Sequence, residues 1–130
     1  MDAASHPLHG LRVLLVEDER LVAMLIEEFI RELGCELACS ANRIVKAIKC
    51  LETTSIDAAI LDLNVAGVST LALAEMLDQR GIPLVFASGY GAQGVDGRWR
   101  TRPVLQKPFT AGELCLALLA ALDEKKQRLP

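Results

Sequence analysis

Short apolar runs alternate along the chain with segments whose apolar residues recur at helical spacing. The runs at residues 11–16, 58–63 and 82–87 have few polar positions, as strands buried on both faces of a parallel sheet require. Weaker strands are expected at 36–40 and 104–106. Strands that alternate with single helices imply right-handed crossovers and helices on both faces of the sheet. The pattern therefore predicts an α/β fold, a doubly wound sheet of five parallel strands.

Five helical positions are expected between and after these strands, four of them with a clear pattern. Apolar residues at 21, 22, 25, 26, 29, 30 and 33 share one broad face of a helix that ends at Gly34. A third helix, after a Ser69 cap, runs to about residue 80, and a last one follows the capping box Thr110-x-x-Glu113 and runs to about residue 126. The second helix spans residues 42–52, with four apolar side chains directed inward: Ile44, Val45, Ile48 and Leu51.

The length of 130 residues indicates one domain, which we place at 11–126 after an N-terminal tail at 1–10. No output domain is expected. Residues 88–102 interrupt the regular alternation, because four glycines fall within nine residues there. Each glycine costs a helix interior roughly 1 kcal/mol relative to alanine. This segment is therefore predicted to form a short or disordered fourth helix.

Composition and charge exclude several classes of function. Hydrophobic residues make up 52% of the chain, so it is not intrinsically disordered, and the 4% aromatic share disfavours a single-strand binder. With a net charge of -3 and no basic stripe, direct nucleic-acid binding is not expected. No apolar stretch reaches the ~18 residues of a membrane span, and the polar N-terminus is not a secretory signal. We expect a cytoplasmic protein that contacts neither membrane nor nucleic acid.

The four cysteines do not form a zinc motif. Cys35, Cys39, Cys50 and Cys115 contain no CxxC pair, and no histidine lies at zinc-ligand spacing from them. Reduced thiols in the core are expected, because free cysteine is commonly buried. A metal or redox pair of Cys35 and Cys39 is the alternative.

Polar residues follow the predicted strands at the edge where open parallel sheets form their sites. Glu17, Asp18 and Glu19 follow the first strand, and Asp62 interrupts the third apolar run near its end. Ser88 follows the fourth strand and Lys107 the fifth. Taken singly, each residue has an ordinary structural explanation. The acids could serve as first-turn or capping residues of the next helix, the lysine could pair with an acid, and the serine could cap a helix.

Together these residues suggest a metal-assisted phosphoryl site. Three carboxylates close to one point repel one another unless a cation lies among them, and oxygen ligands select a hard ion such as Mg²⁺ or Ca²⁺. Carboxylates that leave water positions open suit Mg²⁺ awaiting a phosphoryl group. A neighbouring lysine and hydroxyl would then hold phosphoryl oxygens.

Four motifs carry a resemblance to a known family: Val-Glu-Asp-Glu at 16–19, Leu-Asp-Leu-Asn at 61–64, Ser-Gly at 88–89 and Lys-Pro-Phe at 107–109. From residue 11 to about 123 the chain resembles a response-regulator receiver domain of the chemotaxis type. The resemblance implies a flavodoxin-like sheet with strand order 2-1-3-4-5. It also implies a cis peptide bond between residues 107 and 108.

The resemblance assigns a role to each candidate residue. Asp62 would be the phosphoacceptor, with Ser88 and Lys107 bound to the phosphoryl oxygens. Mg²⁺ would be held by Asp62, by Asp18 and Glu17, and by the backbone carbonyl of Asn64. The donor would be a sensor histidine kinase. The protein would then be a stand-alone response regulator of bacterial two-component signalling. It would act through protein contacts or as a phosphate sink, and its only catalysis would be of its own phosphorylation and dephosphorylation.

The chain departs from that family in its switch region. Most receivers carry an aromatic residue three positions before the lysine, where this chain has Val104. An aromatic instead follows the hydroxyl, in the sequence Phe-Ala-Ser-Gly-Tyr at 86–90. This is similar to the stand-alone "FAT GUY" receivers, which pair with kinases of the HWE and related families. We therefore hypothesise that Tyr90 is the switch aromatic.

Other functions remain open at this stage. A haloacid-dehalogenase-like phosphatase needs a second carboxylate two residues beyond the nucleophile, where this chain has Asn64. A flavodoxin-like FMN carrier needs a phosphate-cradling loop where this chain has three acids. A binding-only pseudo-receiver would not need the intact set of polar residues. Finally, Leu116, Leu119 and Ala120 form a second apolar stripe on the last helix, which makes a dimer through that helix possible.

Overall fold

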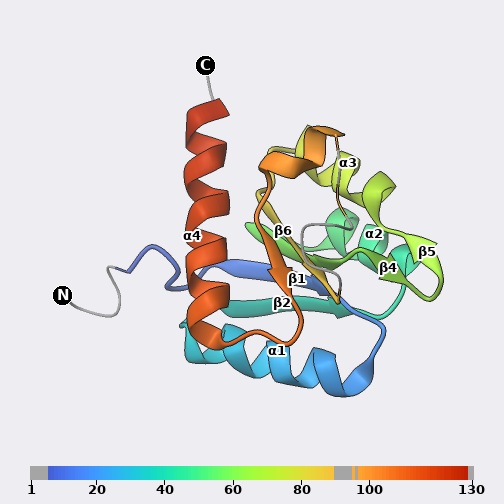
Figure 1. Ribbon diagram of the computed structural model, residues 1–130, viewed down its shortest axis with the longest axis horizontal. Coiled ribbons are helices and arrows are strands. Elements are labelled where there is room, and N and C mark those ends of the chain that lie inside the picture. The colour runs from blue at the N-terminus through green and yellow to red at the C-terminus, as the bar shows by residue number, and fades with distance from the viewer. Residues whose placement is uncertain (1–5, 90–94, 96, 129–130) are drawn as a thin grey trace.

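One parallel sheet organises the molecule (Figure 1). A computed structural model describes residues 6–89, 95 and 97–128. The sheet has the order β2–β1–β3–β6–β7, which is 2-1-3-4-5 when only its own five strands are numbered, as predicted. The strands span the following residues: β1 Arg12–Val16, β2 Glu36–Ala41, β3 Ala58–Asp62, β6 Leu84–Ser88 and β7 Val104–Gln106.

Helices cover both faces of this sheet, as the alternation of elements requires. On one face lie α1 (Arg20–Glu32) and α4 (Ala111–Arg128), which run in different directions in Figure 1 and approach each other near the start of α4. On the other face lie α2 (Ile44–Thr53) and α3 (Leu71–Gln79). The side chains of β1 alternate between the two layers: Val13 and Leu15 pack with α1 and α4, and Leu14 packs with α2 and α3.

Local signals in the sequence account for the ends of two helices. Gly34 follows α1 with a φ of +82°, a conformation that only glycine adopts at little cost. The capping box of α4 forms with both of its bonds: Thr110 N–H donates to Glu113 Oε1 at 3.0 Å, and Glu113 N–H donates to Thr110 Oγ1 at 3.1 Å. Two details of the prediction are wrong. The N-cap of α3 is Thr70 rather than Ser69, and Val45 of α2 is 79% exposed instead of directed inward.

The glycine-rich connection between β6 and β7 contains a short 3₁₀ helix, η3 (Gly97–Thr101), where the alternation calls for a fourth helix. A short helical segment is what the glycine content predicts. A hairpin that the sequence did not predict follows β3. It consists of β4 (Asn64–Val65) and β5 (Val68–Ser69), joined at Ala66 and Gly67, whose φ values of +52° and +80° suit a two-residue turn.

Two of the four cysteines are joined. A disulfide links Cys39 of β2 to Cys50 of α2, with their Cα atoms 6.5 Å apart. The expectation of reduced thiols is wrong for this pair, because the β2–α2 crossover brings together two cysteines that are 11 residues apart. Cys35, the residue suggested as a partner for Cys39, is instead free and buried. Burial, followed by the nearby Cys115, raises the pKa of Cys35 to about 11.

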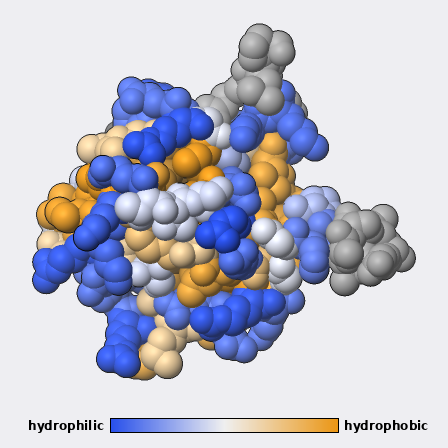
Figure 2. All heavy atoms as spheres, turned by 180° about the vertical axis from the view of Figure 1, so that it is seen from behind, coloured by the Kyte–Doolittle hydropathy of each residue, from blue (hydrophilic) through white to orange (hydrophobic). Residues whose placement is uncertain are grey.

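The surface is mainly hydrophilic on the face shown in Figure 2, with hydrophobic atoms exposed in separate places among charged side chains. The large apolar side chains that are most exposed come from several elements and are Leu21, Met24, Leu25, Val45, Val68 and Leu116. Of the helices in the described ranges, none is long and apolar enough to span a bilayer. In the second stripe of α4, Leu116 is exposed, and Leu119 packs partly against the core.

Candidate functional site

Three carboxylates meet at the edge of the sheet where the parallel strands end. Oxygen atoms of Glu17, Asp18 and Asp62 all lie within 4.8 Å of one another. Over residues 6–89, 95 and 97–128, this is the one group of three acidic or metal-ligating side chains that could hold an ion. Strand alternation explains the meeting, since Glu17 and Asp62 each lie two residues beyond a side chain of the α1–α4 layer.

The ammonium group of Lys107 lies against two of these acids. Its Nζ is 2.5 Å from Glu17 Oε1 and 3.2 Å from Asp62 Oδ2. Lys107 also lies two residues beyond a side chain of the α1–α4 layer, Leu105, so it reaches the edge from the same side of the sheet as the acids. The Glu17 side chain is fully buried, and those of Asp62 and Lys107 are 14% and 15% exposed. The ion pair of Lys107 and Glu17 is therefore largely screened from water.

Burial and charge shift the titration of this pair in ways that follow from the contacts. Burial raises the pKa of Glu17, the hydrogen bonds from Lys107 and from the Glu19 N–H lower it, and the charge of Asp62 raises it again, so that the result is a raised pKa. Burial alone would lower the pKa of Lys107. The hydrogen bond to Glu17 and the charge of Asp62 outweigh that effect and raise it. The lysine is therefore held in its charged form.

Asp18 and the hairpin position each other. Asp18 Oδ2 accepts the Ala66 N–H at 2.8 Å, so the carboxylate holds the turn of the β4–β5 hairpin beside the acidic group. Asn64 begins β4, two residues beyond Asp62. The predicted ligand residue Asn64 is thus on the same short connection as the acceptor candidate.

Thr70 is a contributor that the sequence reasoning missed. This side chain is completely buried, and its hydroxyl donates to the backbone carbonyl of Asp62 at 2.6 Å, while its N–H donates to Leu63 O at 2.9 Å. The threonine therefore fixes the end of β3 and the direction in which Asp62 leaves it. The available signal was a second hydroxyl residue next to the predicted Ser69 cap.

Ser88 and Lys107 lie on neighbouring strands. Ser88 ends β6 and is 3% exposed, and its carbonyl accepts the Lys107 N–H at 2.8 Å. In the sheet register Asp62 pairs with Ala87, so Ser88 is one residue further along the strand next to the acceptor candidate. The Lys107–Pro108 bond is cis, as the resemblance implied. The edge of the sheet thus carries Glu17, Asp18, Asp62, Ser88 and Lys107, the candidate residues that follow or end the predicted strands.

The switch hypothesis falls partly outside the structure. Tyr90 is not among the described residues. Val104, the position at which most receivers have an aromatic, pairs with Phe86 across β6 and β7. An aromatic does contact that pair, because the ring of Trp99 from η3 meets the Phe86 ring edge-on with 5.8 Å between centroids.

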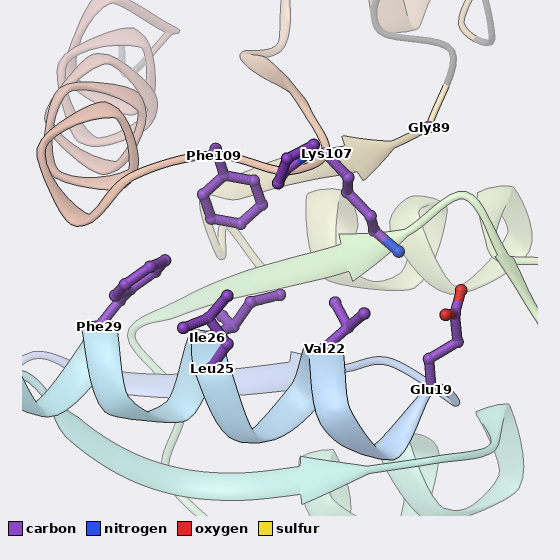
Figure 3. A pocket seen from close by; sticks show the side chains of 9 residues that line it. Glu19, Val22, Leu25, Ile26, Phe29, Gly89, Lys107 and Phe109 are labelled. Atoms are coloured by element: carbon purple, nitrogen blue, oxygen red, sulfur yellow. The ribbon is translucent and has the colours of Figure 1, made fainter.

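An apolar groove opens beside the polar edge (Figure 3). Its volume is about 340 Å³, and it lies between α1 and the connection from β7 to α4. Lys107 and Gly89 border its polar end, and Phe29 and Phe109 lie toward the other end with ring centroids 6.2 Å apart. The groove therefore leads along α1 toward the acidic group. Its lining residues are Glu19, Val22, Leu25, Ile26, Phe29, Gly89, Lys107, Pro108 and Phe109.

The acidic group fits a hard divalent cation. The ligand atom that each of its three residues offers is a carboxylate oxygen, and Mg²⁺ and Ca²⁺ prefer oxygen ligands. One ammonium faces three carboxylates, so the group retains excess negative charge that a cation would neutralise. Burial is the main cause of the raised pKa of Glu17, and the charge of Asp62 adds to it.

Comparison with known families decides among the folds that share this topology. The family model described as the response regulator receiver domain matches residues 13–119. The chain belongs to the response regulator receiver domain family. Receiver domains act in two-component signalling and bind Mg²⁺ at an acidic pocket, and the group of Glu17, Asp18 and Asp62 could hold such an ion.

Solved structures show the same relationship. The receiver domain is 41% identical to SdrG from Sphingomonas melonis Fr1, with a TM-score of 0.79 over 94% of this chain and 99% of SdrG. The BeF3-activated conformation of SdrG from Pseudomonas melonis Fr1 is 44% identical, with a TM-score of 0.76 over 88% of this chain and 98% of that one.

A curated relative is longer. The transcriptional regulatory protein PdtaR of Mycobacterium tuberculosis is 28% identical over 120 residues, which cover 89% of this chain and 58% of PdtaR. The chain therefore spans little more than half the length of that relative.

Proposed function

We propose that this receiver domain accepts a phosphoryl group on Asp62 from a histidine kinase in a Mg²⁺-dependent reaction. The observation that carries the proposal is the meeting of Glu17, Asp18 and Asp62 within 4.8 Å, with Lys107 in contact with two of them. Asp62 is the acid to which the reaction is assigned, because it ends a central strand with Lys107 Nζ 3.2 Å from its carboxylate.

The roles of the chain's own residues follow from their positions. A carboxylate oxygen of Asp62 forms the P–O bond as the P–N bond of the donor phosphohistidine breaks, and the imidazole leaves with the electron pair. Lys107 Nζ is 3.2 Å from Asp62 Oδ2, and its charge offsets that of the transferred phosphoryl group. Ser88, on the neighbouring strand, donates a hydrogen bond to a second phosphoryl oxygen. Thr70 is a positioning residue, since it holds the Asp62 backbone.

Mg²⁺ would be held by the carboxylates of Glu17, Asp18 and Asp62 and by the Asn64 carbonyl. When bound it would neutralise charge on the phosphoryl oxygens during transfer. Glu17 Oε1 lies 2.5 Å from Lys107 Nζ, so this carboxylate would be shared between the lysine and a bound cation. The acceptor returns to a free carboxylate when water attacks the acyl phosphate and inorganic phosphate leaves.

The groove along α1 supports a protein as the donor. A small phosphodonor needs only the polar edge, whereas a kinase must present its histidine from a folded surface. Leu21 and Leu25 are 81% and 48% exposed on α1, and Leu25 lines the groove that ends at Lys107. Apolar surface of this kind beside a reactive group marks a contact site for a partner. A kinase of the HWE or a related type is the partner we propose.

Phosphorylation by a small donor tests the chemistry. Incubation with acetyl phosphate and Mg²⁺ should add the mass of one phosphoryl group to the wild type and none to Asp62→Asn. Asp57→Asn is the matched control, because Asp57 lies just before the opposite end of the same strand, where it accepts the Arg12 N–H at 2.9 Å. Chelation of Mg²⁺ should abolish labelling. Equal labelling of the wild type and Asp62→Asn would refute the assignment.

A second measurement separates the donor surface from the chemistry. Leu25→Asp should slow transfer from a phosphorylated HWE-type kinase and leave labelling by acetyl phosphate unchanged. Val45→Asp is the control, since Val45 is equally apolar and 79% exposed but lies on α2, on the other face of the sheet. If both variants slow transfer equally, the groove is not the contact site.

A further inference from the structure

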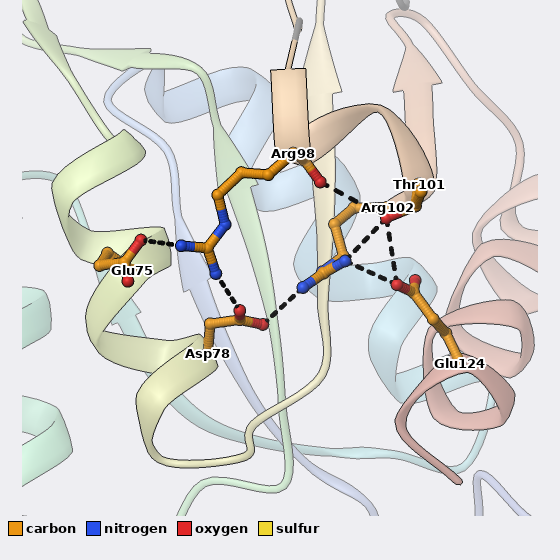
Figure 4. Close-up of polar contacts among 6 residues, drawn as sticks. All are labelled: Glu75, Asp78, Arg98, Thr101, Arg102 and Glu124. Carbon is orange, nitrogen blue, oxygen red and sulfur yellow. Dashed lines mark hydrogen bonds and ion pairs between the residues drawn. The ribbon is translucent and has the colours of Figure 1, made fainter. Parts of the chain in front are cut away.

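The η3 segment is tied to two helices by a network of ion pairs (Figure 4). Arg98 contacts Glu75 at 2.7 Å and Asp78 at 2.5 Å, both on α3. Arg102 contacts the same Asp78 at 2.8 Å and Glu124 of α4 at 2.6 Å. One carboxylate, Asp78, thus receives two guanidinium groups, and the pair of arginines connects α3 to α4.

The same two arginines also contact Trp99. The guanidinium carbons of Arg98 and Arg102 lie 4.6 and 5.6 Å from the centroid of the Trp99 ring, in the geometry of cation–π contacts. The ring is 7% exposed, and it meets Phe86 edge-on. Any displacement of this ring would therefore disturb both arginines and, through them, their contacts with α3 and α4.

Phe86 connects the ring to the proposed phosphorylation site. It lies on β6 two residues before Ser88, so the two side chains share one face of the strand. The η3 segment also joins the two strands that bear Ser88 and Lys107, which are themselves bonded backbone to backbone at 2.8 Å. A phosphoryl group on Asp62 would draw both residues toward its oxygens. The ends of β6 and β7 would then shift beneath η3.

We propose that Arg98, Trp99 and Arg102 form a latch that closes on α3 and α4 through Asp78 and Glu124, and that phosphorylation of Asp62 opens it. The proposal rests on the proposed function, because Asp62 supplies the trigger. Trp99 packs against Phe86, the residue that pairs with Val104 in the sheet register. The buried Arg102 Nε has no hydrogen-bond acceptor, so the closed arrangement leaves one donor unsatisfied.

Opening would change the surface between α3 and α4. Glu75, Asp78 and Glu124 would lose their two arginine partners in the segment, and the apolar ring that covers Phe86 would move. A downstream protein would distinguish the two states by this acidic surface. Through the latch, phosphorylation at the edge of the sheet would change the surface between α3 and α4, which the phosphorylation site does not contact.

Trp99 is the single tryptophan of the chain, so its fluorescence reports the latch directly. We expect beryllofluoride with Mg²⁺ to shift the emission of the wild type to longer wavelength and to increase quenching by acrylamide, because the ring becomes exposed. Asp62→Asn should show neither change. Binding of beryllofluoride is followed separately by ¹⁹F NMR. Stoichiometric binding with unchanged emission and quenching would overturn the latch and leave the proposed function intact, whereas absence of binding would overturn both.

Linkage provides a second, independent measurement. If the closed latch opposes loading of the site, then weakening it must favour loading. Arg98→Gln removes two ion pairs from a half-exposed side chain and should lower the half-saturating concentration of beryllofluoride about two- to tenfold. Glu36→Gln is the matched control, because it removes an exposed ion pair, 2.8 Å to Arg12, at the far side of the sheet. Equal shifts in both variants would overturn the latch.

Discussion

The acidic group should destabilise the fold that it equips for chemistry, and removal of one charge tests this. In the absence of divalent cations, Asp62→Asn relieves the repulsion between Asp62 and the two neighbouring acids, and it gives up the attraction to Lys107. The side chain changes little in size, so packing is preserved. The variant therefore isolates the charge of Asp62.

The structure sets the size of the effect. Two charges 4.8 Å apart repel each other by about 3.5 kcal/mol at an effective dielectric of 20. Asp62 has two such neighbours, of which the exposed Asp18 is partly screened by solvent. The attraction to Lys107 over 3.2 Å is about 5 kcal/mol on the same scale. Repulsion exceeds attraction by a small margin, so we expect Asp62→Asn to be about 1 kcal/mol more stable, or roughly 4 °C higher in melting temperature.

Urea and thermal unfolding in EDTA measure this difference, with Glu36→Gln as the control. Glu36 is also paired with a positively charged side chain, Arg12, at 2.8 Å, but it is not part of the acidic group. The same loss of one negative charge there should change stability by less than about 0.5 kcal/mol, in the destabilising direction. Opposite signs for the two variants would identify crowding of acids, and not overall charge, as the cause.

Added Mg²⁺ should reverse the order. A ligand that binds only the folded state stabilises it by an amount that grows with concentration. The wild type, with three carboxylates, should gain more than Asp62→Asn, and the two melting temperatures should converge and then cross. A variant that is less stable than the wild type in EDTA would refute the reasoning, because it would mean that Lys107 more than compensates the acids.

Four further predictions follow from other contacts. Lys107→Ala should bind Mg²⁺ several-fold more tightly by calorimetry, since Glu17 loses a competing partner at 2.5 Å, and should be phosphorylated at least about tenfold more slowly by acetyl phosphate. Thr70→Val should cost about 1–2 kcal/mol in urea unfolding, because the carbonyl that accepts its hydroxyl loses its donor, and Thr70→Ser should retain most of the stability. The pKa of Cys35 is raised to about 11 in the folded state, so the folded state holds the thiol proton more tightly than the unfolded chain does. The stability that this protonation contributes to the folded state is therefore complete below pH 9 and is lost as the pH rises toward 11. Cys35→Ala should accordingly show a flatter decline in urea-measured stability over that interval, by up to about 2–3 kcal/mol. If the second stripe of α4 mediates a dimer, Leu116→Asp should abolish any dimer seen by sedimentation in the phosphorylated wild type, since Leu116 is 70% exposed.

The main architecture was predictable because it depends on local patterns that repeat. Buried strands produce apolar runs, and amphipathic helices produce an apolar stripe, so each element could be placed before any contact was known. The strand order came from resemblance, since periodicity alone does not specify which strands are neighbours. Val45 was placed wrongly for a related reason. A ten-residue helix has more apolar positions than its buried face needs, and the crossover decides which of them face the sheet.

The site was predictable to the extent that sheet topology brings strand ends together. Glu17, Asp62 and Lys107 meet because each leaves its strand on the same side of the sheet. Contacts that depend on the path of a loop were not predictable. The hydroxyl of Thr70 reaches back eight residues to Asp62, and the Cys39–Cys50 link depends on how one crossover packs.

The two charged clusters of the molecule suit different tasks. In the acidic group one ammonium faces three carboxylates at the edge of the sheet, and a cation or a phosphoryl group changes that balance directly. In the latch two guanidinium groups face three carboxylates, and the buried Arg102 holds Asp78 and Glu124 in place. The first cluster is sensitive to added charge, whereas the second is sensitive to displacement of Trp99. Phe86 contacts Trp99 of the second cluster and lies on the strand that ends at Ser88, so β6 is the element through which the chemistry of the first cluster can reach the second.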